Sequence, residues 1–206
     1  MTKKIQRGRV EIFRSCEKNV TECIGEDKAI GLIHKELIKN NCPMKEKYQI
    51  VETICGNLNP NKSSRSKGVF VNYEDIKEQK KVTLHVMRNV LLHALDACKA
   101  GSMSGNDSFL ACTAIRSKNL LSCNKDDVES CAPTLDGKAS YKERSRARDP
   151  EQLHMNCVWQ TALKALMGTE NFDKEKATSA MKASWNYCYN DLKPLGRRYI
   201  DWEEGE

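Results

Sequence analysis

The sequence lacks the short motifs that carry most known enzyme chemistry. It has no Gly-rich phosphate loop, no G-x-S-x-G nucleophile motif and no H-E-x-x-H metal motif. No C-x-x-C pair occurs and only four histidines are present, so zinc held by cysteine and histidine is a poor interpretation. These absences predict a chain that is not an enzyme, with no catalytic residue, no metal and no cofactor.

Long apolar runs and clusters of basic and aromatic residues are missing as well. No run of 18 apolar residues exists, so we expect no membrane insertion. The first residues lack the apolar core of a signal peptide, which we interpret as a mature chain with an added Met. The net charge of +6 is mixed with 28 acidic residues, and aromatic residues are few. Nucleic acid is therefore not expected as a partner.

Cysteine, in contrast, is abundant. The ten cysteines are even in number and spread through the chain, which favours disulfide bridges over metal ligation. Disulfides persist in oxidising compartments, so the composition predicts a secreted, extracellular protein. Three N-x-S/T triplets, beginning at Asn19, Asn61 and Asn106, would be glycosylation sites in such a protein. We expect bridges to use Cys16, Cys23, Cys42, Cys55, Cys98, Cys112, Cys123, Cys131, Cys157 and Cys188.

One long segment, residues 73–100, is predicted to be a central helix. Nothing in it forces a turn, because it contains neither Gly nor Pro. Apolar residues recur in it at spacings of three and four, which is one face of an α-helix. Its second half is apolar almost all round, as in a helix buried among others. The inward residues are expected to include Leu84, Met87, Leu91, Ala94 and Cys98.

Other helical patterns surround this segment. They cover residues 11–21, 26–40, 44–55 and 109–123, and two further helices begin at Asp149 and Asp173. Asp149 followed by Pro150 is the best helix start, with a capping carboxylate and a proline at the first position. No strand pattern appears, so we predict an all-α, disulfide-bridged single domain over residues 1–206, with six or seven helices. Polar loops are expected at 57–68 and 132–148, and a frayed tail at 196–206.

Two groups of side chains are candidates for binding a small molecule. His85, Asn89, His93 and Asp96 form a polar stripe along the central helix, beside Arg88. The stripe would either line a cavity or form the solvated edge of the helix. The second group is aromatic and would either wall a pocket or pack between helices. The predicted ligand-binding residues are Arg88, His93, Trp159, Trp185 and Tyr189.

The loop at 132–148 is a candidate surface for a protein partner. It is strongly basic and has almost nothing to bury. It would either grip an acidic surface or be an ordinary solvated loop. The partner-binding residues predicted there are Lys138, Lys142, Arg144, Arg146 and Arg148.

Three short stretches resemble the insect odorant-binding superfamily, including the D7 salivary proteins of blood-feeding flies. They are residues 13–19 (FRSCEKN), residues 94–99 (ALDACK), and residues 156–159 (NCVW) leading into 172–177 (FDKEKA). The resemblance implies a helical protein of saliva that sequesters small host mediators, either lipids or amines, in an internal pocket. We expect the protein to be a monomer. The alternative prediction is an inhibitor of a host protein of haemostasis or immunity that acts through its basic surface.

Overall fold

The computed structural model describes residues 3–55, 80–103, 105–123, 125–131 and 149–198. The predicted loops at 57–68 and 132–148 lie outside these ranges, as does most of the predicted tail. The described chain forms two compact units, residues 1–99 and residues 100–206. The single domain predicted for residues 1–206 stays a prediction.

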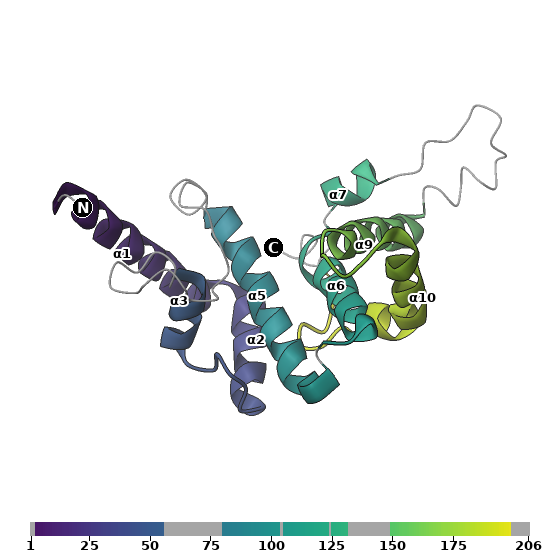
Figure 1. Cartoon of the computed structure of the whole chain (residues 1–206), viewed down its shortest axis with the longest axis horizontal. Coiled ribbons are helices and arrows are strands. Elements are labelled where there is room, and N and C mark those ends of the chain that lie inside the picture. The colour runs from purple at the N-terminus through teal and green to yellow at the C-terminus, as the bar shows by residue number, and fades with distance from the viewer. Residues whose placement is uncertain (1–2, 56–79, 104, 124, 132–148, 199–206) are drawn as a thin grey trace. The chain divides into compact units, whose positions relative to one another are not determined.

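The described residues are helical and contain no strand, so the prediction of an all-α, disulfide-bridged fold is confirmed (Figure 1). Unit 1 holds α1 (Lys3–Glu26), α2 (Lys28–Lys39), α3 (Lys47–Cys55) and α5 (Lys80–Ala100). Unit 2 begins with a short 3-10 turn, η2 (Gly101–Met103), and holds α6 (Asp107–Leu121), α7 (Lys125–Ser130), α9 (Pro150–Met167) and α10 (Lys174–Asn190).

Side-chain caps explain where several of these helices begin. Asp149 accepts a hydrogen bond from the amide of Glu151 at 3.2 Å, and Asp173 accepts one from Lys176 at 2.8 Å. Asp27 caps α2 in the same way, at 2.8 Å from the amide of Ile30. Such caps satisfy amides that have no partner inside the helix. The predicted starts at Asp149 and Asp173 are therefore correct.

Unit 1 is built on the apolar faces of α2 and α5. The face of α2 buries Ile30, Ile33 and Leu37 completely. Helix α5 lies near α2 (Figure 1), to which the Arg88–Asp27 ion pair connects it. It buries a set of large side chains that includes two of the predicted inward residues. Two disulfides close the unit, Cys16–Cys55 and Cys42–Cys98, with Cα–Cα distances of 6.0 and 5.7 Å. The fully buried side chains on α5 are Met87, Leu91, Leu92 and Leu95.

Unit 2 packs α6 against α9 and α10, with α7 against α9. Its core is made of small and medium side chains such as Ala111, Ile115, Val158 and Met181. Its disulfides are Cys112–Cys188, which joins α6 to α10, and Cys123–Cys157, which joins the end of α6 to α9. Short side chains between these helices allow the close approach that the bridges require.

Three expectations about the chain need correction. Residues 3–10 are helical, so the helix predicted over 11–21 begins earlier and is part of α1. The helix predicted over 44–55 begins at Lys47, after Met44 adopts a positive φ of 67°. The expectation that all ten cysteines form bridges is wrong, because Cys131 is a free thiol and the buried Cys23 lies outside the four disulfides.

Candidate functional site

The polar stripe on α5 lies at the edge of unit 1. His85 and His93 are exposed, whereas Asn89 and Asp96 are partly buried. The side-chain amide of Asn89 donates a hydrogen bond to the carbonyl of His85 at 2.7 Å. This arrangement fits the solvated edge of an otherwise buried helix. His85 and His93 are thus on the solvent-exposed side of α5.

Arg88, a predicted ligand-binding residue, forms a contact that stabilises the fold. Its guanidinium pairs with the carboxylate of Asp27, with Nη2 and Oδ2 2.5 Å apart. Both side chains are mostly buried. Asp27 therefore joins α2 to α5 while it also caps α2. Such a charge-assisted pair fixes one helix against the other.

The predicted aromatic group does assemble in unit 2. The rings of Trp159 and Trp185 meet edge to face at 5.1 Å, and Trp185 stacks on Tyr189 at 5.0 Å. The hydroxyl of Tyr189 lies 2.9 Å from Nδ1 of the buried His154, and Arg198 covers the Tyr189 ring at 4.7 Å. These contacts are those of helix packing between α9 and α10.

The predicted ligand-binding residues thus fall into two groups. Arg88 and His93 lie on α5 in unit 1, whereas Trp159, Trp185 and Tyr189 lie on α9 and α10 in unit 2. Neither unit by itself brings the five together, and their role in binding stays a prediction. The predicted partner-binding loop residues Lys138, Lys142, Arg144, Arg146 and Arg148 lie outside the described residues.

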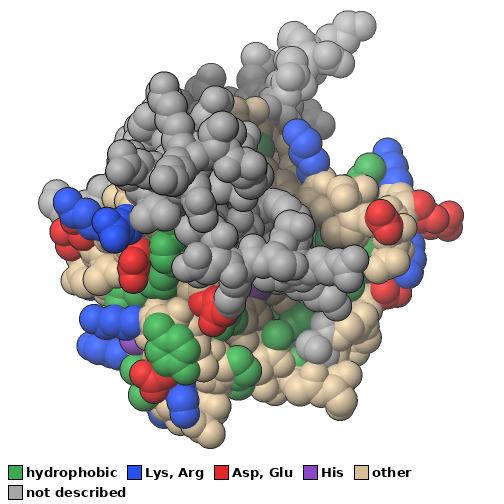
Figure 2. Space-filling view, turned by 60° about the vertical axis from the view of Figure 1, so that its left-hand side comes forward, with side chains coloured by type: hydrophobic (Ala, Val, Ile, Leu, Met, Phe, Trp, Pro, Cys, Tyr) green, Lys and Arg blue, Asp and Glu red, His purple; other side chains and the backbone are tan. Residues whose placement is uncertain are grey.

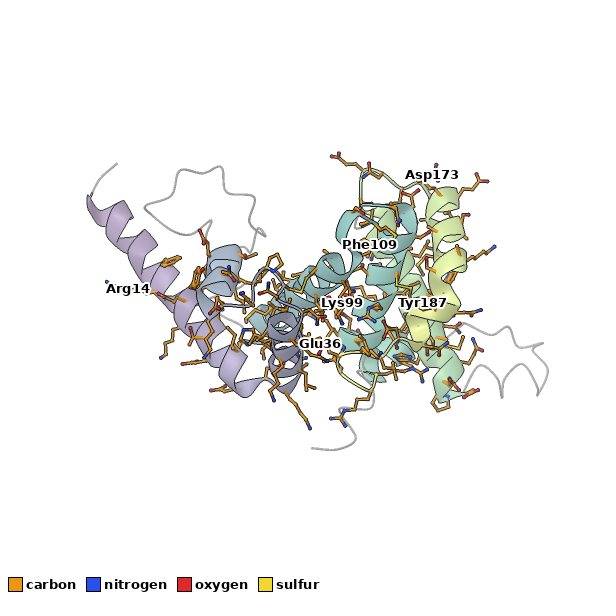
Figure 3. The ribbon with its side chains drawn as sticks, turned by 90° about the horizontal axis from the view of Figure 1, so that it is seen from below. Arg14, Glu36, Lys99, Phe109, Asp173 and Tyr187 are labelled. Atoms are coloured by element: carbon orange, nitrogen blue, oxygen red, sulfur yellow. A yellow bond between two sulfur atoms is a disulfide. The ribbon has the colours of Figure 1, made fainter. Side chains whose placement is uncertain are left out.

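Two lysine ammonium groups and an asparagine amide surround the carboxylate of Glu36 near the end of α2. The side-chain amide of Asn40 donates to it at 3.1 Å, and the ammonium groups of Lys39 and Lys99 lie 3.7 and 3.6 Å away. Glu36 and Lys99 are both labelled in Figure 3. The Asn40 hydrogen bond lowers the pKa of Glu36, the two lysines add to this, and burial opposes it. The visible face in Figure 2 likewise mixes acidic and basic side chains over its described part.

We expect the Glu36 cluster to make unit 1 less stable in acid. The pKa of Glu36 lies below 4.5 in the fold, so between that value and 4.5 the unfolded chain binds more protons. The stabilisation is present above pH 4.5 and is lost as the pH falls through the folded pKa. Glu36→Gln should therefore lower the melting temperature more at pH 7 than at pH 3, as measured by circular dichroism. Lys99→Met should show a smaller difference of the same sign, and an equal effect of Glu36→Gln at both pH values would contradict this.

Sequence reasoning missed the buried cation of unit 2. Arg116 lies inside the apolar α6 and is only 4% exposed. Its guanidinium forms an ion pair with Asp191 and donates to the carbonyl oxygens of Asp191 at 3.1 Å and Lys193 at 2.6 Å. Asn119, one turn further along, donates to the carbonyl of Tyr189 at 2.7 Å. The sequence did contain a signal for this cation, because Arg116 and Asn119 lie in the middle of a helix that is otherwise buried. Buried polar side chains need hydrogen-bond partners, so these two residues indicated contacts with another part of the chain.

The described residues contain no cluster of metal ligands. Among the described ranges, no three His, Cys, Asp or Glu side chains gather closely enough to hold a metal ion. In unit 2 burial lowers the pKa of Lys118, while the Asp127 carboxylate works against this. Among all the residues that the structure describes, in both units, no helix is long and apolar enough to cross a membrane.

Comparison with known proteins identifies the family. A family model described as "Peptidase M76 family" matches residues 14–196, which is most of the chain and includes parts of both units. The chain therefore belongs to the Peptidase M76 family. No solved structure matches the chain.

Three curated relatives carry the name "Mitochondrial inner membrane protease ATP23 homolog". The one from Homo sapiens is 23% identical over 89% of this chain and 70% of its own length. Those from Xenopus laevis and Danio rerio are each 29% identical over 54% of this chain, and the match covers 43% and 39% of their lengths. The chain thus spans less than half the length of these two relatives.

The family match overturns the functional interpretation drawn from the sequence. The resemblance to odorant-binding and D7 proteins is wrong, and with it the secreted salivary protein that sequesters host mediators. The prediction that the chain is not an enzyme fails because the family is one of peptidases. The extracellular location fails because the relatives are named as mitochondrial inner membrane proteins. The three short motifs misled because bridged helices occur in more than one class of protein.

Proposed function

We propose that this chain acts on polypeptides at the mitochondrial inner membrane, as a protein of the protease type for which its relatives are named. The observation that carries the proposal is the length of the family match, from residue 14 to residue 196. A match of that extent includes the helices of both units rather than one short motif. Binding a polypeptide is the first step of any such action.

The disulfides support a particular environment for this action. Four bridges hold the two units, and such bridges form and persist where thiols are oxidised. The chain would therefore work on a side of the inner membrane where disulfides are maintained.

The edge of α5 is the surface that we assign to polypeptide contact. His85 and His93 are exposed on a helix whose opposite face is buried in the core of unit 1. The Cys42–Cys98 disulfide and the Arg88–Asp27 ion pair connect α5 to the rest of unit 1, and binding groups are most accurately placed when they project from such a supported element. Imidazole and amide groups both donate and accept hydrogen bonds, which is the chemistry that recognition of a peptide backbone requires.

Binding to an unfolded polypeptide tests the proposal. The probe is fluorescein-labelled ribonuclease A that has been reduced and carboxymethylated, and fluorescence anisotropy measures its binding to the oxidised full chain. We expect saturable binding, which the double variant His85→Ala, His93→Ala weakens by about tenfold, equivalent to 1.4 kcal/mol. Asn186→Ala, at an exposed position on α10, is the matched control and should bind like the natural chain. Absence of binding by the natural chain would refute the proposed function.

A further inference from the structure

A peptidase site built on a helix has defined chemical requirements. In the H-E-x-x-H arrangement, two histidines four residues apart bind zinc from one face of the helix, and the glutamate after the first histidine acts as the general base. Four residues correspond to about 6 Å along the helix axis, which lets both imidazoles reach one ion.

Only α5 carries two histidines, among the helices that the structure describes. The other two histidines of the sequence, His34 and His154, lie on α2 and α9. His85 and His93 are eight residues apart, or about 12 Å along the axis. That is twice the separation of a zinc-binding pair. His85 and His93 therefore cannot form the pair by themselves.

Asn89 lies midway between the two histidines and divides α5 into two windows of the required length. The first runs from His85 to Asn89 and the second from Asn89 to His93. Each window has one histidine, and each has Asn89 at its other ligand position. A neutral amide oxygen suits hard cations better than zinc, and the Asn89 amide nitrogen is already bonded to the His85 carbonyl at 2.7 Å.

The position of the general base is also occupied by an unsuitable residue in both windows. Val86 follows His85, and Val90 follows Asn89. A valine side chain neither accepts a proton nor orients a water molecule, so neither window has a base. Both valines are partly buried against unit 1, in line with a packing role.

We infer that α5 presents the polar face of a helix-borne peptidase site in which each window has one zinc-binding histidine instead of two and lacks the base that such a site needs. A zinc ion in the H-E-x-x-H arrangement is therefore not part of this chain's action on polypeptides. The inference rests on the proposed function in one respect, namely that the molecule that contacts this face of α5 is a polypeptide. The inference excludes only this zinc-dependent chemistry. Any cleavage of polypeptides by the natural chain should therefore persist in the presence of the zinc chelator 1,10-phenanthroline.

Zinc binding tests the inference without reference to activity. The oxidised full chain is dialysed against zinc chloride, and bound metal is counted by mass spectrometry and titrated by calorimetry. We expect well below one zinc per natural chain. The double variant Asn89→His, Val90→Glu should bind zinc at least about tenfold more tightly, because it completes the second window with His93. Circular dichroism verifies that the variant is folded.

A matched double variant on α10 controls for added histidine and glutamate. Asn186→His, Tyr187→Glu places the same residue types at exposed positions, but Asn190 rather than a histidine stands four residues on. This control should bind zinc no better than the natural chain. The inference is overturned if the natural chain holds one zinc that His93→Ala removes, or if the folded α5 variant gains no affinity. Failure of the proposed function would instead appear as loss of polypeptide binding, with zinc binding unchanged.

Discussion

Removing the Cys112–Cys188 bridge with Cys112→Ala, Cys188→Ala is expected to lower the free energy of unfolding of unit 2 by about 4 kcal/mol. The bridge closes a segment of 76 residues, so its loss releases a large amount of conformational entropy in the unfolded chain. It also joins α6 to α10, which enclose the core of the unit. A loss of this size would leave little of the stability of an ordinary small domain.

Urea unfolding followed by tryptophan fluorescence measures this effect. All three tryptophans lie in residues 100–206, so the signal reports on unit 2. The denaturant dependence should also steepen, because an unfolded chain without the bridge exposes more surface. Cys131→Ala, which removes a sulfur outside the bridges, is the matched control and should change stability by less than about 0.5 kcal/mol. A cost below about 1 kcal/mol for the double variant would contradict the expectation.

Replacing the buried cation of unit 2 by Arg116→Met should cost about 3 kcal/mol. The substitution leaves the Asp191 carboxylate without its partner, and it also removes the donors to the carbonyl oxygens of Asp191 and Lys193. This cost is at the lower end of the range for breaking a buried ion pair, because the Asp191 side chain is 33% exposed and regains some hydration. The same tryptophan-monitored unfolding measures it.

Two further variants separate the contributions of charge and geometry. Arg116→Lys keeps the positive charge but cannot bond several acceptors in one plane, so an intermediate loss is expected. Lys176→Met breaks an exposed ion pair with Asp107, in which the charged atoms are 3.2 Å apart, and should cost less than about 1 kcal/mol. Equal losses for Arg116→Met and Lys176→Met would show that burial of the Arg116 pair is energetically unimportant.

Much of the helical layout was predictable because the signals for it are local. Asp149 and Asp173 are each followed by a run with helical periodicity, and a capping carboxylate acts within three residues. The inward face of α5 was predictable for the same reason, since Met87 and Leu91 repeat at helical spacing. Local chemistry decides these features, so one sequence is enough to find them.

The pairing of the cysteines and the partners of Arg116 could not be predicted in this way. Cys112 pairs with a residue 76 positions away, and Arg116 pairs with Asp191 near the end of the chain. Such partners are chosen by the packing of whole helices. The polar stripe on α5 was visible in the sequence, but its interpretation required the family. Absence of H-E-x-x-H in one sequence describes that sequence and does not exclude membership of a peptidase family.

The distribution of cysteines between the units has a practical consequence. Each unit holds five cysteines, an odd number, so pairing within a unit leaves one sulfur outside the bridges. In unit 1 this is Cys23, which is fully buried, whereas in unit 2 it is Cys131, which is partly exposed. An alkylating reagent applied to the folded protein will therefore react far more readily at Cys131 than at Cys23. The natural chain already carries a selective attachment point for a fluorophore or spin label, without any engineered cysteine.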